Sequence, residues 1–124
     1  MTKFFIFTVV VFAAIIMCTK AQVAGGLGAS KPVDADVTEV IERQRESIIK
    51  KICDSGSTCP SSDAKIVINT YKTQTVSGTN YFVALTIDDI IYHVRIFSQP
   101  WTHREEVHAV QGPKELTDEI SYFV

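Results

Sequence analysis

Residues 65–97 read KIVINTYKTQTVSGTNYFVALTIDDIIYHVRIF, and this stretch decides the fold. It contains three runs in which apolar and polar residues alternate and Ile, Val, Thr and Tyr predominate, a pattern typical of β-strands. The three predicted strands are residues 65–75, 79–87 and 90–97. Ser77-Gly78 and Asp88-Asp89 interrupt the pattern and predict tight turns. Because these connections are short, we expect the strands to pair antiparallel as consecutive hairpins.

A helix is predicted before these strands. Apolar residues recur there at spacings of three, four, seven and eight, which places them on one face of a helix of about 16–18 residues. They are Val37, Val40, Ile41, Ile48, Ile49 and Ile52. Asp36 and Glu39 fit a capping box at its start. Lys50 and Lys51 suit the negative end of the helix dipole in its last turn.

Two further strands are predicted after the opening stretch. Residues 98–103 form the next connection, and residues 105–111 form a fourth strand that Gly112-Pro113 ends. Residues 120–124 predict a short fifth strand. One helix followed by hairpin-linked strands is typical of an α+β domain, in which an antiparallel sheet of four to five strands carries the helix across one face.

The first 21 residues differ from the rest. Lys3 is followed by an apolar run of about 15 residues, and Ala21 places a small residue before a cleavage point. We therefore expect a signal peptide over residues 1–21 and a secreted protein. An uncleaved membrane anchor is the alternative, although roughly 20 apolar residues are needed to span a bilayer. Residues 22–124 then form a single domain without a membrane segment, and its Gly-rich residues 22–33 are expected to be a flexible arm.

Composition and motifs exclude several classes of protein. The chain carries 12 Lys and Arg against 14 Asp and Glu, a net charge of −2, which gives no electrostatic case for a nucleic-acid partner. The sequence has no nucleophile elbow and no phosphate-binding loop, so neither an enzyme nor a cofactor is expected. His103 and His108 flank Glu105-Glu106, but positions 103 and 108 face opposite sides of a strand, so we expect no metal site.

Cys53 and Cys59 are separated by five residues in a Gly- and Ser-rich loop. In an oxidising compartment such a pair is most simply a disulfide. Two free thiols and a metal site are the alternatives. A metal site needs two more ligands, and the histidines lie far along the chain.

Three segments carry apolar or flexible residues for which a purely structural domain has no need. Val76 lies at the tip of the first predicted hairpin, Trp101 is the only tryptophan and follows Pro100, and Gly25-Gly26 interrupt the arm. Alternate connections of a meander fall at the same end of the sheet, so the first and third connections should share one edge. Apolar groups gathered at loop tips predict a partner surface.

These segments resemble those of the cystatin superfamily of cysteine-protease inhibitors, and the stefin branch in particular. The Gln-x-Val-x-Gly hairpin of that family is matched by residues 74–78, and residues 79–82 and 93–97 are similar to stefin strands. The arm around Gly25-Gly26 is also similar to the stefin arm. Stefins are usually cytosolic and lack signal peptides and disulfides, so the predicted signal peptide and disulfide depart from their pattern. Pro100-Trp101 is similar to the hairpin of secreted cystatins.

The resemblance implies a cystatin-like sheet wrapped around one long N-terminal helix. It also implies a reversible, competitive inhibitor of papain-like cysteine proteases such as cathepsins, whose arm and two hairpin loops enter the active-site cleft. The implied protease-binding residues are Val23, Ala24, Gly25, Gly26, Gln74, Thr75, Val76, Ser77, Gly78, Pro100 and Trp101. A secreted, non-inhibitory binding protein that uses the same edge is the alternative. We expect a monomer, and a domain-swapped dimer is the other possibility.

Overall fold

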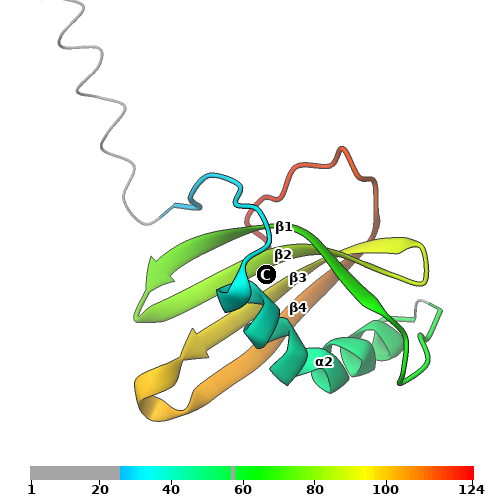
Figure 1. Ribbon diagram of the computed structural model, residues 1–124, viewed down its shortest axis with the longest axis horizontal. Helices are drawn as coiled ribbons and strands as arrows, with labels where there is room; N and C mark the ends of the chain where they lie inside the picture. The colour runs from blue at the N-terminus through cyan, green and yellow to red at the C-terminus, as the bar shows by residue number, and fades with distance from the viewer. Residues whose placement is uncertain (1–25, 57) are drawn as a thin grey trace, which may run out of the picture.

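The computed structural model describes residues 26–56 and 58–124. Its elements follow in the order α2 (Ala35–Asp54), β1 (Ile66–Val76), β2 (Gly78–Ile87), β3 (Ile90–Gln99), the 3-10 helix η2 (Pro100–Thr102) and β4 (Arg104–Lys114). The strands form one antiparallel sheet in the order β1-β2-β3-β4, and α2 lies across one face of it (Figure 1). The predicted α+β meander is therefore confirmed, with four strands.

The apolar stripe predicted for α2 is the part of the helix that is buried. All six predicted Val and Ile residues are buried, and no other residue of the helix is. They pack against one face of the sheet, where Val83, Leu85 and Val94 are inaccessible to solvent. Burying each such side chain stabilises the fold by about 1.5–3 kcal/mol, so this interface holds the helix on the sheet.

The N-cap of α2 is Asp34, not Asp36 as the capping-box pattern predicted. One carboxylate oxygen of Asp34 accepts a hydrogen bond from the backbone N–H of Val37 at 3.0 Å, and the other accepts one from the hydroxyl of Tyr71 on β1. Asp36 instead accepts a hydrogen bond from the hydroxyl of Tyr81 on β2 at 2.9 Å. Burial, together with Asp34, raises the pKa of Tyr71 to about 12. The sheet therefore selects which aspartate caps the helix.

The prediction that Gly112-Pro113 ends the fourth strand is wrong. β4 continues to Lys114, which lies opposite Ile91 of β3. Because β4 is an edge strand, Pro113 can be accommodated there without leaving a central hydrogen bond unmade.

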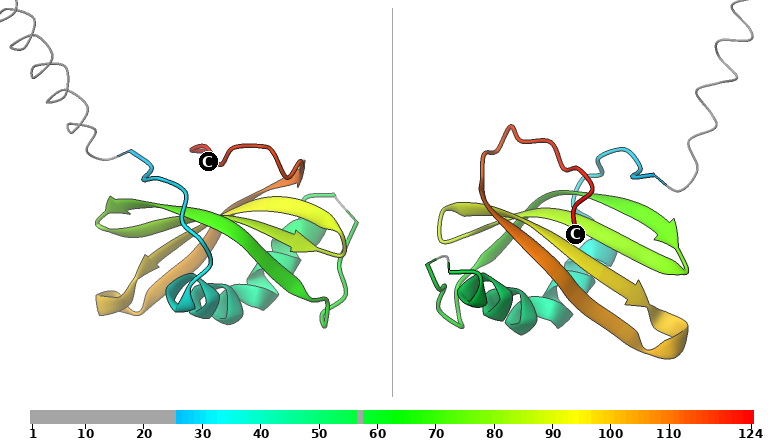
Figure 2. Two further views of the ribbon diagram at one scale, coloured as in Figure 1. Left: turned by 45° about the horizontal axis from the view of Figure 1, so that its top comes forward. Right: turned by 180° about the vertical axis from the view of Figure 1, so that it is seen from behind.

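The prediction of a fifth strand over residues 120–124 is also wrong. This segment lies without strand pairing on the face of the sheet opposite α2 (Figure 2). Ile120 and Phe123 are buried there against Phe82. The ammonium group of the buried Lys72 donates a hydrogen bond to the carbonyl oxygen of Ile120 at 2.8 Å. Side-chain contacts therefore hold the C-terminus where ladder pairing was expected.

The predicted signal peptide, residues 1–21, lies outside the described residues, as do Val23, Ala24 and Gly25 of the predicted arm. Within residues 26–56 and 58–124, no helix has the length and apolar character needed to cross a bilayer.

Candidate functional site

The hairpin between β1 and β2 has a shorter turn than the predicted strands, residues 65–75 and 79–87, implied. Backbone pairing continues to Val76 opposite Gly78, so that Ser77 alone forms the tip. Val76 is 45% exposed, as expected for a tip residue. The side-chain amide of Asn80 donates a hydrogen bond to the side-chain oxygen of Gln74 at 3.0 Å, which links the first residue of the motif to the opposite strand.

Glycine is the residue type that suits position 78. Its φ is 144°, a conformation that L side chains rarely adopt. A Cβ added there would lie 2.7 Å from the carbonyl oxygen of Ser98 and 3.1 Å from the ring of Phe97. The base of the first hairpin is therefore packed directly against the end of β3, which leads into the second loop.

The connection between β3 and β4 is the one-turn helix η2. Pro100 occupies its first turn, where a missing N–H costs nothing. His103 follows in the left-handed conformation, with φ 55°, and its N–H donates to the carbonyl oxygen of Pro100 at 3.0 Å. Trp101 is 68% exposed on this turn. The loop thus holds a large apolar ring in solvent.

The arm runs along the outer edge of β1. The N–H of Gly28 donates to the carbonyl oxygen of Thr73 at 2.9 Å, and Lys31 and Tyr71 exchange two backbone hydrogen bonds at 2.8 and 3.2 Å. Because this contact is antiparallel, the chain before Gly28 is directed toward the tip of the first hairpin. Gly26 is the first described residue of the segment.

We call residues 26–28, residues 74–78 and Pro100–Thr102 the loop edge. Figure 1 shows all three segments at the left-hand side of the sheet, whereas the β2–β3 turn lies at the right. The predicted placement of the two hairpins at one end, opposite Asp88-Asp89, is therefore confirmed. Val23, Ala24 and Gly25 are not among the described residues, and whether any residue of the edge binds a protease stays a prediction.

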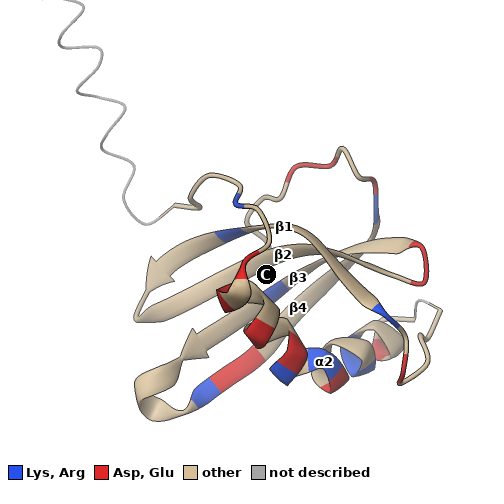
Figure 3. Ribbon diagram, viewed as in Figure 1, with Lys and Arg blue, Asp and Glu red and all other residues tan. Residues whose placement is uncertain are grey.

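The loop edge contains no Lys, Arg, Asp or Glu (Figure 3). The nearest charged residues along the chain are Lys72 before the first hairpin tip and Arg104 after the second loop, followed by Lys31 on the arm. The residues of the edge themselves therefore bring no full charge into an interface, where its desolvation would be costly. Arg95 and Arg104 lie beside the edge, because they line the same surface pocket as Val76.

Glu105, at the start of β4, links the ends of β3 and β4 to α2. Its side chain is 15% exposed and accepts hydrogen bonds from Arg43 at 2.9 and 3.0 Å, from Gln44 at 3.0 Å and from Ser98 at 3.1 Å. Burial opposes ionisation, but the hydrogen bonds from Arg43, Gln44 and Ser98 keep the pKa of Glu105 below its usual range. The sequence predicts Glu105 only as the first residue of the fourth strand and does not indicate this role, because its partners on α2 lie 61 and 62 residues away.

Two further polar features, the buried His93 and the Asp88-Asp89 turn, have structural roles. His93 is 2% exposed, and burial lowers its pKa, so it is a structural residue. Asp88 and Asp89 have φ values of 50° and 65°, as in a two-residue hairpin turn. In the part of the chain that the structure describes, no three His, Cys, Asp or Glu residues are grouped so that they could hold a metal ion.

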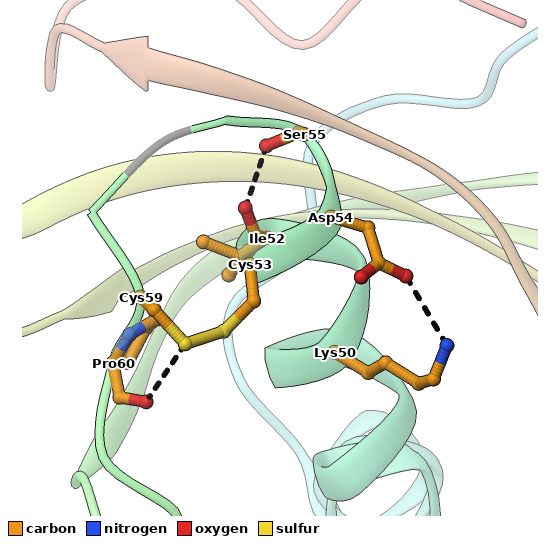
Figure 4. Close-up of a disulfide and its surroundings, with 7 residues drawn as sticks. All are labelled: Lys50, Ile52, Cys53, Asp54, Ser55, Cys59 and Pro60. Carbon is orange, nitrogen blue, oxygen red and sulfur yellow. Dashed lines mark hydrogen bonds and ion pairs between the residues drawn. A yellow bond between two sulfur atoms is a disulfide. The ribbon is translucent and has the colours of Figure 1, made fainter.

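A disulfide joins Cys53 to Cys59, as predicted, and their Cα atoms are 4.4 Å apart (Figure 4). It connects the last turn of α2 to the segment that leads into β1. The same turn is closed by hydrogen bonds from the hydroxyl of Ser55 to the carbonyl oxygen of Ile52 at 2.7 Å and from Lys50 to Asp54 at 3.2 Å. This constraint lies at the end of the sheet away from the loop edge (Figure 1).

Comparison with known proteins shows a consistent set of relatives. The chain is 36% identical to Cystatin-A2 of Dictyostelium discoideum over 99 residues, which are 80% of this chain and 96% of the relative. It is 34% identical to Cystatin-B of Oplegnathus fasciatus, over 77% of this chain and 94% of the relative. It is 28% identical to human Cystatin-A, over 82% of this chain and all of the relative. No protein-family model matches the chain.

These relatives contradict the prediction of a secreted protein with a signal peptide. Stefins are typically intracellular and have neither signal peptides nor disulfides. The three relatives are matched over 94–100% of their own lengths by 77–82% of this chain, so part of this chain has no counterpart in them. Secretion and a signal peptide conflict with the pattern of this family. The disulfide stands, because the structure contains it, and in this respect the chain departs from the stefin pattern.

The fold and the sequence relatives lead to the same family. A single helix on a four-stranded antiparallel meander is the architecture implied by the resemblance, and the Gln-x-Val-x-Gly residues lie on its first hairpin. The relatives at 34–36% identity are covered almost completely. The chain therefore belongs to the stefin branch of the cystatin superfamily, a family of cysteine-protease inhibitors and not of enzymes.

Proposed function

We propose that this protein is a reversible, competitive inhibitor of papain-like cysteine proteases, cathepsins among them, and that the loop edge enters the active-site cleft. One observation carries the proposal. The exposed side chains of Val76 and Trp101 lie at the same end of the sheet as the arm, on an edge without charged residues. An apolar, uncharged edge is suited to a cleft from which it can displace water.

Each segment has its own part in the proposed complex. Val23 and Ala24 occupy subsites on the non-primed side, and Gly25 lets the backbone turn away before the catalytic cysteine. Residues 74–78 fill the centre of the cleft. Pro100 and Trp101 pack on the primed side, where a tryptophan that becomes buried is a typical hot spot.

The proposed inhibitor resists cleavage because it offers no accessible peptide bond in the geometry of attack. Strand pairing reaches Val76 and Gly78, so the first tip is a closed hairpin rather than an extended segment. The arm supplies extended chain, and Gly25 is proposed to direct it away from the nucleophile. Binding is then reversible, and substrate competes for the same cleft.

The test is a titration of the full chain, residues 1–124, against papain and a panel of cathepsins. We expect one chain to inhibit one protease, with inhibition relieved by excess substrate and by dilution. Trypsin, a serine protease, is the control and should remain active. The absence of papain and cathepsin inhibition at micromolar concentrations would overturn the proposal and favour a non-inhibitory role for the same edge.

A further inference from the structure

One side chain, that of Gln99, joins the two hairpin loops of the loop edge. Gln99 is the last residue of β3. Its side-chain N–H donates a hydrogen bond to the backbone carbonyl oxygen of Ser77, at the tip of the first hairpin. Its side-chain oxygen accepts a hydrogen bond of 2.7 Å from the hydroxyl of Thr102, in the second loop. Both ends of the amide are used, one toward each loop.

We propose that Gln99 is a positioning residue that sets the spacing between the first hairpin tip and the Trp101 loop before a protease binds. The inference rests on the proposed function, and it identifies what organises the binding site rather than another contact with the protease.

The strand ladder alone does not hold the two tips together. Pairing between β2 and β3 begins at Thr79 opposite Ser98, and both tips extend beyond that pair. Ser77 belongs to the β1–β2 hairpin and Thr102 to the β3–β4 connection, so each tip has its own strands behind it. The packing of Gly78 against Ser98 fixes the bases of the two loops. Gln99 is the residue that connects them further out.

Positioning has a kinetic signature that a direct contact lacks. A protein whose loops reach the binding geometry only part of the time binds with an affinity reduced by that fraction. The loss then appears in the association rate constant, whereas the loss of an interface contact appears mainly in dissociation. From the usual strength of a hydrogen bond, we expect removal of the Gln99 amide to lower the association rate constant about two- to tenfold.

The experiment compares three variants with the unaltered protein. Gln99→Met keeps the length of the side chain and removes both hydrogen bonds. Gln99→Glu keeps an oxygen for Thr102 and removes the donor to Ser77. Gln111→Met is the matched control, because Gln111 lies on β4 opposite His93, well away from both tips. Stopped-flow mixing with papain gives the rate constants, and urea unfolding gives the stability of each variant.

A second measurement needs no protease. Trp101 is the only tryptophan of the chain, so its fluorescence reports on the second loop alone. We expect time-resolved anisotropy to show more rapid local motion of Trp101 in both Gln99 variants than in the unaltered protein and in Gln111→Met. We also expect slower association with papain, an unchanged dissociation rate constant and an unchanged urea midpoint.

Two results would overturn the inference. One is that Trp101 moves no faster in either Gln99 variant than in the control. The other is that the association rate constants of the Gln99 variants equal that of the unaltered protein. If the unaltered protein does not inhibit papain, the proposed function fails, and the anisotropy comparison still decides whether Gln99 holds the loops.

Discussion

At one end of the sheet the β2–β3 turn consists of Asp88 and Asp89, whereas at the other end the loops expose Val76 and Trp101. The aspartate turn is exposed to solvent and adopts the positive φ values of a two-residue hairpin. The disulfide closes the chain at the same end. The loop edge has neither charged residues nor a covalent constraint, and side chains such as Gln99 organise its loops.

The difference indicates how stability and the proposed binding are distributed. The disulfide end limits the freedom of the unfolded chain, which stabilises the fold without contacting a partner. The loop edge keeps apolar groups in water, where they contribute little to folding and remain available for binding. Changes at the disulfide end should therefore alter the free energy of unfolding, and changes at the loop edge should alter the inhibition of papain. A residue of the edge that also packs against the sheet should affect both.

Gly78→Val should have the largest effect, because Gly78 contributes both to the stability of the fold and to the proposed binding surface. The new side chain meets the carbonyl oxygen of Ser98 and forces an unfavourable φ, and we expect a loss of about 2–4 kcal/mol in the free energy of unfolding, with loss of inhibition. Gly56→Ala is the control at the other end. Gly56 also has a positive φ of 87° but nothing lies within 4 Å of an added Cβ, so about 1 kcal/mol is expected. Equal urea midpoints for the two variants would contradict the close packing at Gly78.

Trp101→Ala should separate binding from stability. The ring is exposed in the free protein and buried in the proposed complex, so we expect the free energy of binding to papain to weaken by about 1–3 kcal/mol, while thermal unfolding is unchanged. Tyr122→Ala is the matched control, because Tyr122 is a half-exposed aromatic residue that contacts Phe82 and Arg95 away from the loop edge. Similar inhibition by both variants and the unaltered protein would remove Trp101 from the binding surface.

Removing the disulfide should lower stability and leave binding to papain unchanged, the reverse of the result for Trp101→Ala. Replacing Cys53 and Cys59 by Ser frees a short loop, and we expect the free energy of unfolding to fall by about 2 kcal/mol with the inhibition constant unchanged. Urea unfolding and papain titration of the same sample test both parts. A higher inhibition constant for papain, measured under conditions in which the variant is fully folded, would show that the two ends are coupled.

Shortening the arm should act on dissociation. A chain that begins at Leu27 keeps the hydrogen bonds of Gly28 and Lys31 with β1 and lacks Val23 and Ala24. Compared with the full chain, we expect dissociation from papain to be roughly tenfold faster and association to be similar, because the lost contacts exist only in the complex. Equal dissociation rate constants would exclude the arm from the interface.

Glu105→Gln should have the smallest effect, and that effect should depend on pH. Because the folded state lowers the pKa of Glu105, its carboxylate stabilises the fold above the unfolded pKa of 4.5, and this stabilisation is lost as the pH falls through the lower folded value. We expect Glu105→Gln to be less stable by about 1 kcal/mol at pH 7, and the difference to shrink toward pH 3. The control is Glu46→Gln, since Glu46 is exposed on α2. A pH-independent difference would contradict the role of the charge.

Periodicity predicted the elements of this fold well because it reports local burial. The buried stripe of α2 and the three hairpin-linked strands that follow it could be recognised from the spacing of apolar residues alone. The loop edge could be predicted from the parity of a meander and from exposed apolar residues at its turns. Gln99 and Glu105 had no such signal, because their partners lie 22 and 62 residues away in the sequence.

The sequence by itself determined the architecture and the family, since burial periodicity and the Gln-x-Val-x-Gly motif are local patterns. Only the tertiary structure decided which aspartate caps α2, because the hydroxyl of Tyr71 donates to Asp34 and the hydroxyl of Tyr81 donates to Asp36. It also decided that the C-terminus packs through Phe123 instead of pairing as a strand. The physical reason is the same in each case. Local alternatives of nearly equal energy are decided by the residues that the rest of the chain brings within hydrogen-bonding or van der Waals distance.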